Sequence, residues 1–137
     1  MPVNTKRFVI ILDESLPAGL AANAAAVLST SMGCQRPEIV GHNVQDGTGG
    51  LHAGITTLPI AILKAGQQAI QRLRSTAEEQ QLLAAGFTRT AQRSKNYGHY
   101  EQRMSACRAC DLEYAGIALF GCAEKITSLT GSLSLLR

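Results

Sequence analysis

The residues best suited to chemistry in this chain of 137 residues begin at the end of its first apolar run. Asp13 follows residues 8–12, Phe-Val-Ile-Ile-Leu, and a turn with Pro17 and Gly19 leads into an alanine-rich segment that carries Asn23. A strand that feeds a helix places the free backbone N–H groups of the first helical turn beside the strand end. This junction therefore predicts a cleft for an anionic or carbonyl group.

A polar segment farther along the chain is expected to close the cleft. Lys95 would supply positive charge, and Tyr97 and His99 would line the cleft from the loop over residues 93–99. Polar loop residues after a strand gather near the strand ends, which favours this placement. The predicted ligand-binding residues are Asp13, Gly19, Asn23, Lys95, Tyr97 and His99. We expect a small anionic ligand, and the sequence identifies no catalytic residue, cofactor or metal ligand.

Four cysteines leave a redox or metal role open. Cys107 and Cys110 have the CxxC spacing that lets two sulfur atoms share a metal ion or a disulfide, with Cys34 and Cys122 elsewhere in the chain. A second CxxC motif is missing from the sequence. Because a helical cysteine on an apolar face usually acts as a small hydrophobic residue, we favour that interpretation.

Other polar groups have simpler explanations than chemistry. His42 and His52 lie in a predicted hairpin, where either is a general-base candidate or, as we favour, a solvated side chain. Residues 47–50, Gly-Thr-Gly-Gly, fit a hairpin turn better than a phosphate loop. Arg89, Arg93 and Lys95 beside Tyr97 resemble a small phosphate-binding cluster, but alternating residues on an exposed strand give the same pattern.

Composition predicts one domain over residues 1–137 with a true hydrophobic core, because 45% of the residues are hydrophobic. A formal net charge of +3 is small for a nucleic-acid-binding protein, so we do not expect that function. The apolar run at 8–12 is too short for a signal peptide or a membrane span. We expect a cytoplasmic protein with reduced cysteines and no membrane partner.

Strands and helices alternate along the chain, which predicts an α/β protein with three layers, α/β/α, and a mixed sheet. Residues 8–12, 60–64 and 116–120 are continuous apolar runs and should be buried inner strands. We expect the hairpin, over residues 38–57, at a sheet edge. The other expected elements are a first helix ending at Gly33, a helix over 67–85 stopped by Gly86, a strand over 87–92, helices over 99–108 and 122–130, and a terminal strand with Leu133 and Leu135.

The C-terminal pattern resembles a known fold. Residues 116–121, Gly-Ile-Ala-Leu-Phe-Gly, the sequence Glu124-Lys125-Ile126 and the ending over residues 129–136, Leu-Thr-Gly-Ser-Leu-Ser-Leu-Leu, are similar to the last strand, helix and tail of type 2 peptidyl-tRNA hydrolases. Residues 59–65 resemble that family's second strand, and residues 35–57 look like an inserted hairpin. With the Asn-Ala-Ala-Ala run at 23–26 and the Leu-Leu-Arg end, the whole pattern closely resembles the family called domain of unknown function 2000. That resemblance implies a hydrolase-like fold and no assigned reaction.

The chain departs from the hydrolases at their catalytic positions. Those enzymes rely on a lysine at the head of the first helix and on an Asp-Ala-Gly-x-Thr loop after the third strand. By the surrounding pattern, Gly19 takes the lysine position, and Arg93-Ser94-Lys95 takes the position of the loop. We therefore expect no peptidyl-tRNA hydrolase activity. Two function classes stay open: small-molecule or nucleotide binding at the head of the first helix, and a non-catalytic homodimeric interaction domain.

Overall fold

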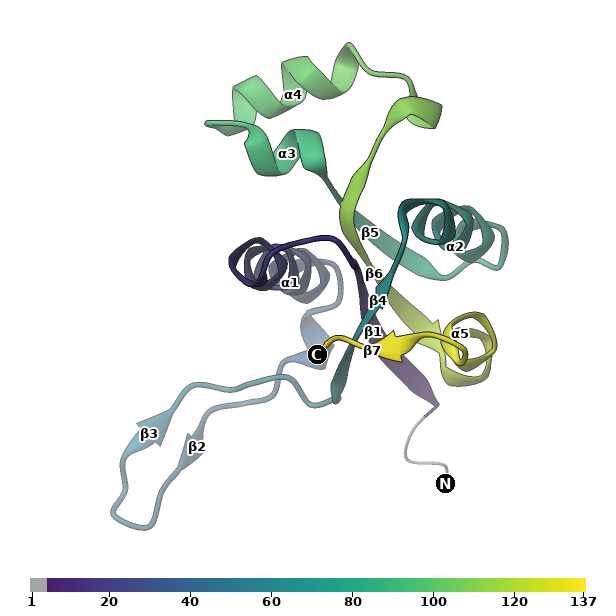
Figure 1. The fold of residues 1–137 in the computed structure, drawn as a ribbon. Helices are drawn as coiled ribbons and strands as arrows, with labels where there is room; N and C mark the ends of the chain where they lie inside the picture. Colours follow the sequence, from purple (N-terminus) through teal and green to yellow (C-terminus); the bar gives the residue numbers. More distant parts are fainter. Residues whose placement is uncertain (1–4) are drawn as a thin grey trace.

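A five-stranded mixed sheet forms the centre of the molecule, with helices on both faces (Figure 1). The computed structural model describes residues 5–137. In sheet order the strands are β5 (Leu83–Thr88), β6 (Tyr114–Cys122), β1 (Lys6–Asp13), β4 (Ile60–Ala65) and β7 (Ser134–Leu135). β1 runs parallel to β4 and antiparallel to β6, and β5 is antiparallel to β6. The predicted α/β class and mixed sheet are confirmed.

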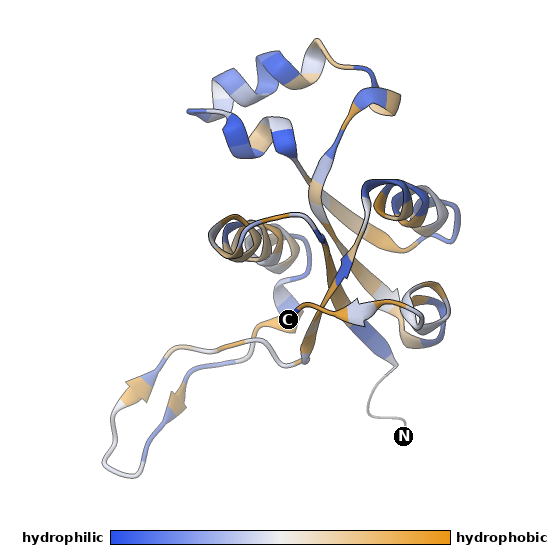
Figure 2. Ribbon diagram, viewed as in Figure 1, coloured by the Kyte–Doolittle hydropathy of each residue, from blue (hydrophilic) through white to orange (hydrophobic). Residues whose placement is uncertain are grey.

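Alternating side chains of β1 divide the core into two layers. Phe8, Ile10 and Leu12 pack toward α1 (Ala18–Gln35), which covers one face of the sheet. Val9 and Ile11 pack on the other face, which α2 (Gln67–Glu79) and α5 (Ala123–Thr130) cover. Because successive side chains of a strand point to opposite faces, a continuous apolar run requires cover on both sides. The predicted three-layer arrangement follows from this burial, and Figure 2 shows the hydrophobic residues of the central strands between the helices.

β4 is less buried than the other two predicted inner strands. Ile60, Ala61 and Ile62 are only half-buried, whereas nearly all of β1 and β6 is buried. The outer neighbour of β4 is the two-residue strand β7, which pairs with Leu63 and Lys64 alone. The inner position of β4 was therefore predicted correctly, but the short neighbouring strand leaves its first half with less cover.

The region after α2 differs from the sequence-based expectation. The predicted helix over 67–85 was too long, because Gln81 takes a left-handed backbone conformation with φ of 61° and the Leu82 N–H donates to the carbonyl of Ala77 at 2.9 Å. This C-terminal motif usually uses glycine or asparagine, so glutamine gave no signal for it. The following strand is β5, over 83–88, and not the predicted 87–92.

Two short helices replace the predicted strand end and loop after β5. These are α3 (Arg89–Arg93) and α4 (Tyr97–Ser105), the latter shorter than the predicted helix over 99–108. The Thr88 hydroxyl accepts a hydrogen bond from the Ala91 N–H, and Asn96 Oδ1 accepts one from the His99 N–H. Both are N-cap interactions, which satisfy backbone N–H groups at a helix start. Thr88 and Asn96 therefore set where α3 and α4 begin.

The predicted hairpin is present but does not join the edge of the main sheet. β2 (Val44–Gln45) and β3 (Leu51–His52) pair only with each other and project from the body (Figure 1). We call residues 40–57 the arm. Short 3₁₀ helices lie before it at Pro37–Ile39 and, far along the chain, at Ala109–Asp111. No helix among the described residues is both long and apolar enough to cross a membrane.

Candidate functional site

Asp13 lies at the carboxyl end of β1 and is the centre of a buried polar cluster. Its side chain is 7% exposed, and Arg89 Nη1 lies 3.0 Å from its Oδ2. Gln67 Nε2 donates to the same oxygen at 2.8 Å, and both the N–H and the hydroxyl of Ser15 donate to Oδ1 at 2.9 Å. The cluster joins the ends of β1 and β5 to the start of α2. β1, β4 and β5 run in the same direction, so their carboxyl ends lie at one edge of the sheet.

Gln67 connects this cluster to β6. Its Oε1 accepts a hydrogen bond from the Tyr114 N–H at 2.8 Å, and its Nε2 also donates to the Tyr114 carbonyl. One turn later, Gln71 Nε2 donates to the Leu112 carbonyl at 3.0 Å. Two side chains of α2 thus hold the chain segment that enters β6. No buried side-chain polar atom within residues 5–137 lacks a hydrogen-bond partner, so the cluster is satisfied internally.

These contacts keep Asp13 ionised. Burial raises the pKa of its carboxyl group, but the hydrogen bonds from Ser15 and Gln67 and the positive charge of Arg89 outweigh burial and lower the pKa below its ordinary value. Each carboxylate oxygen of Asp13 already accepts hydrogen bonds from donors within the protein, and a ligand would have to compete with them. The carboxylate is therefore better suited to holding α3 in place than to binding a ligand directly.

A cleft of about 450 Å³ lies beside α3 and α4, and we call it the α1–α4 cleft. One wall is the middle of α1, the floor is the end of β5, and the other wall is formed by α3, α4 and their connection. Among the described residues it is lined by Val27, Leu28, Thr30, Ser31, Gly86, Phe87, Ala91, Ser94, Asn96, Tyr97 and Tyr100. None of these side chains is charged, so the lining favours a neutral ligand with apolar surface.

Two tyrosines give the cleft an aromatic wall. Tyr97 is 72% exposed, and its ring meets the ring of Tyr100 edge to face at 5.3 Å between centroids. Asn96 Oδ1 already caps α4, which leaves the Asn96 amide NH₂ group to donate to a ligand. Exposed aromatic rings with a nearby amide are typical of sites that stack a planar group and orient it by hydrogen bonds.

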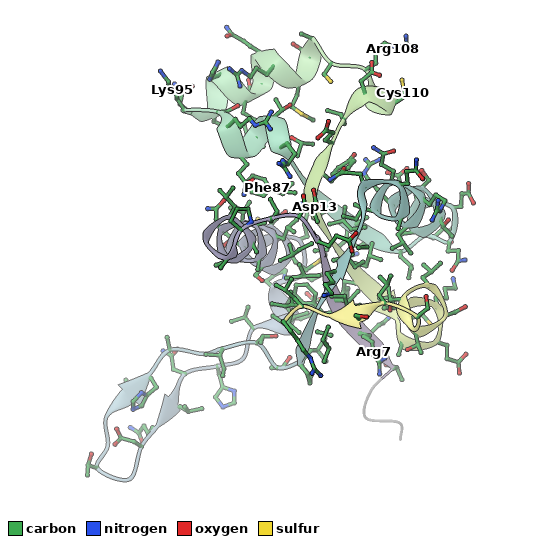
Figure 3. All side chains as sticks on the ribbon, viewed as in Figure 1. Arg7, Asp13, Phe87, Lys95, Arg108 and Cys110 are labelled. Atoms are coloured by element: carbon green, nitrogen blue, oxygen red, sulfur yellow. The ribbon has the colours of Figure 1, made fainter. Side chains whose placement is uncertain are left out.

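The structure places five of the six predicted site residues in four different surroundings. Asp13 belongs to the buried cluster, while Asn23 Oδ1 accepts a hydrogen bond from Gln92 Nε2 at 3.3 Å and so joins α1 to α3. Tyr97 lines the α1–α4 cleft. Lys95 and His99 lie together on a shallow outer surface of α4, and the Lys95 N–H donates to His99 Nδ1 at 3.4 Å. Figure 3 shows Lys95 far from Asp13, at the outer end of the α3–α4 connection.

The head of α1 is open, and the residues of its first turn are not part of the α1–α4 cleft. Gly19 lies in the first turn, and a Cβ atom built on it would meet nothing within 4 Å. α1 has no side-chain cap and no acidic residue in that turn. Loop 93–99 approaches the middle of α1, at Val27 and Ser31, and thus forms its cleft farther along the helix than the sequence suggested.

The remaining sequence candidates lie away from these sites. His52 Nε2 lies 2.8 Å from Asp46 Oδ2 within the arm, whose tip is a turn as predicted for residues 47–50. All four cysteines are free, with Cys110 exposed and Cys107 partly buried. Residues 5–137 hold no group of three or more metal-binding side chains. Arg89 is paired with Asp13 and thus does not extend a basic surface with Arg93 and Lys95.

Gln67 and the role of Arg89 were not found from the sequence. Arg89 was identified as basic, but its pairing with an aspartate 76 residues away depends on the sheet order. Gln67 had one usable signal, because it directly follows Gly66 at the end of a predicted strand. Side chains at such positions point toward the carboxyl edge of a parallel sheet.

The comparisons with known proteins agree with this fold. Residues 6–137 match the family model described as "Protein of unknown function (DUF2000)". A solved structure of a protein of unknown function from Agrobacterium tumefaciens is similar over 97% of this chain and 98% of that chain, with a TM-score of 0.89 and 19% sequence identity. At this identity the likeness shows the fold alone. No curated protein matches the chain.

Proposed function

Because the chain belongs to the DUF2000 family of proteins of unknown function, its activity must be inferred from its own site, and we propose that it binds a small neutral molecule in the α1–α4 cleft. The observation that carries this proposal is the lining of the cleft: eleven residues without a formal charge, two of them tyrosines, surround about 450 Å³. That volume lies within the range of small-molecule sites. A planar, partly apolar ligand that stacks on Tyr97 fits this lining best.

The buried cluster around Asp13 holds one wall of the α1–α4 cleft in place. Arg89 is the first residue of α3, and its ion pair with Asp13 fixes the start of the helix that carries Ala91 and leads to Ser94. The Thr88 hydroxyl lies 3.5 Å from Met104 Sδ, which ties α4 to β5. The outer wall of the cleft is thus anchored to the sheet at two points, and such anchoring reduces the ordering cost of ligand binding.

NMR titration with indole as a neutral aromatic probe tests this proposal. We expect amide shift changes at Val27, Ser31 and Tyr97. Removal of the Tyr97 ring, by Tyr97→Ala, should weaken indole binding about threefold to tenfold, the range expected for the loss of an aromatic pair. Lys95→Ala is the matched control, since Lys95 lies outside the cleft lining, and it should leave indole affinity unchanged. Shift changes confined to other surfaces would contradict the proposal.

The sequence-based alternative, an anionic ligand at the head of α1, has one structural feature in its favour. The first turn has neither a side-chain cap nor an acidic residue, and its free N–H groups carry partial positive charge. Titration with inorganic phosphate separates this hypothesis from the first. Shift changes over residues 18–21 would support the anion site, with Asp13, Gly19, Asn23, Lys95, Tyr97 and His99 as the residues to substitute next.

We also propose that the scaffold is related to the type 2 peptidyl-tRNA hydrolases without their reaction. The support is the order of elements, in which β4 and α2 follow α1, and β6 leads into α5 and the Leu-rich tail as in the resemblance described from sequence. Gly19 and Arg93-Ser94-Lys95 occupy the positions where those enzymes carry catalytic groups. The scaffold then serves binding, and the reaction has been lost.

A further inference from the structure

Charge is distributed very unevenly along this chain. Residues 15–57 contain only three charged side chains, Arg36, Glu38 and Asp46, although the whole chain has 13 Lys and Arg and 10 Asp and Glu. Arg36 and Glu38 are also close to each other, with 4.0 Å between Nε and Oε1. The 18-residue helix α1 has no charged residue at all. Surfaces that are depleted in charge are characteristic of the buried centres of protein interfaces.

The same stretch carries most of the exposed large hydrophobic side chains. Nine are found among the described residues, and six of them lie between residues 20 and 55: Leu20, Val27, Val40, Val44, Leu51 and Ile55. Four of the six are on the arm, where Leu51 is 70% exposed and Ile55 is 79% exposed. Contact with a partner that removes such side chains from water lowers the free energy and so favours association.

The arm is held in shape at both ends but is uncovered along its length. At its base the Gly41 N–H donates to the Ile55 carbonyl at 2.8 Å, and the Thr57 N–H donates to the Ile39 carbonyl at 2.7 Å. At its tip Asp46 Oδ1 accepts hydrogen bonds from the N–H groups of Thr48 and Gly50. A lone two-stranded ribbon is at best marginally stable in water, so a covering partner is expected.

Both faces of the arm offer apolar contact. Val44 is paired with His52 and Leu51 is paired with Gln45, so Val44 and Leu51 point to opposite faces of the ribbon. No cation lies within residues 40–57, and the single anion is Asp46. Nucleic acid and anionic membranes bind through Lys and Arg, which the arm lacks. A partner with an equally uncharged surface matches it better.

We propose that the arm of one copy of this chain packs against the outer side of α1 in a second copy, and that the second arm returns the contact. α1 offers a charge-free surface, and it lies on the same side of the molecule as the arm (Figure 1). A two-fold axis that brings one arm to the partner's α1 necessarily brings the other arm back. This inference concerns assembly and goes beyond ligand binding; of the exposed α1 residues, Val27 and Thr30 also line the α1–α4 cleft.

The size of the surface agrees with a stable dimer. Ten residues of α1 and fifteen residues of the arm are exposed. Standard protein interfaces use roughly 20 to 30 residues a side. An arm that reaches around a neighbour also adds contact without requiring the two bodies to be flat against each other.

Sedimentation equilibrium of the full chain tests the dimer. We expect self-association between about 1 and 300 µM, the range around the micromolar affinity that interfaces of this size reach. Leu51→Lys with Ile55→Lys should raise the dissociation constant at least about tenfold, because central apolar contacts dominate interface energy. Gln68→Lys with Gln102→Lys adds the same charge at exposed sites on α2 and α4 and should leave association unchanged.

A second substitution tests where the arm docks. Ala26 is exposed on α1, and Ala26→Glu should weaken association about as much as the arm substitutions, with the monomer fold retained by circular dichroism. A wild-type chain that stays monomeric over the whole concentration range overturns the proposal. A dimer that keeps its affinity after the arm or the α1 substitution overturns it as well. Indole binding is measured on the same monomeric variants. Whether they bind indole tests the proposed function separately from dimerisation.

Discussion

Arg89 Nη1 lies 3.0 Å from Asp13 Oδ2, and this buried ion pair ties the start of α3 to the end of β1. The two side chains are only 25% and 7% exposed, so removing one leaves the other charged group poorly solvated. The pair thus links the sheet to the wall of the α1–α4 cleft.

Asp13→Ala should lower the free energy of unfolding by about 3 kcal/mol, because breaking a buried ion pair from one side strands its partner. Urea denaturation followed by circular dichroism measures the change. Glu14→Gln is the matched control, since Glu14 is exposed and its substitution should change stability by less than about 0.5 kcal/mol. Equal stability of the two variants would show that Asp13 and Arg89 contribute nothing as a pair.

Stability should also depend on the ionisation of Asp13. Its pKa in the folded protein lies below the ordinary value of 3.8, so the unfolded chain takes up the proton first as the pH falls. The ionised carboxylate therefore contributes its full stabilisation above about pH 4, and this contribution is lost as the pH falls through the folded-state pKa. We expect the difference in unfolding free energy between the wild type and Asp13→Asn to shrink below pH 4. A difference that stays constant down to pH 2 would argue against this assignment.

The sequence predicted the core better than the site. Continuous apolar runs identified β1 and β6 because burial on both faces leaves no alternation. The end of α2 was missed because Gln81 takes the left-handed conformation that usually requires glycine. The start of α3 was missed because residues 87–92 were assigned to a strand, whereas the N-cap at Thr88 ends β5 and begins α3.

The cleft that Tyr97 lines lies farther along α1 than the sequence suggested. Tyr97 was expected in a loop at the head of α1, but it is the first residue of α4 and lines a cleft at the middle of α1. Its position depends on α3, which was not predicted, and on the start of α4, which was predicted two residues too late. The hairpin of the arm was predicted from its turn residues and was expected at a sheet edge. The edges of the main sheet are instead β5 and β7, and the hairpin forms a separate two-stranded sheet.

Gly86→Ala should destabilise the protein because β5 passes close under an aromatic ring. A Cβ atom on Gly86 would lie 2.8 Å from Cε1 of Tyr114, whose ring is packed beneath the Arg74 guanidinium. The overlap cannot be relieved by a flexible side-chain end, so we expect a loss of about 1 to 3 kcal/mol. Gly47→Ala is the control, since a Cβ there meets nothing within 4 Å. Thermal denaturation compares the two, and an unchanged melting temperature for Gly86→Ala would contradict the packing.

Peptidyl-tRNA hydrolysis should be absent or very slow. Under the proposed relation to the type 2 hydrolases, Gly19 and Arg93-Ser94-Lys95 stand where those enzymes carry catalytic groups, and loss of a positioned proton-transfer group typically lowers the rate about 10²- to 10⁴-fold. A turnover assay with a purified peptidyl-tRNA and an active type 2 hydrolase as the positive control measures this directly. A rate like that of the control would mean that the chain has rebuilt its catalytic groups elsewhere.

Gly19→Ala separates a structural from a functional reason for the glycine in the first turn of α1. The space around Gly19 is open, and alanine is the better helix former, so we expect a gain of about 0.5 to 1 kcal/mol in the free energy of unfolding. A natural protein that keeps such a glycine gives up stability, which a ligand approaching the backbone N–H groups would explain. We expect Gly19→Ala to leave indole binding in the α1–α4 cleft unchanged, because Gly19 is not part of its lining. If the substitution instead weakens binding of inorganic phosphate, the head of α1 is the anion site; if it lowers stability, the helix start is more constrained than its open surroundings indicate.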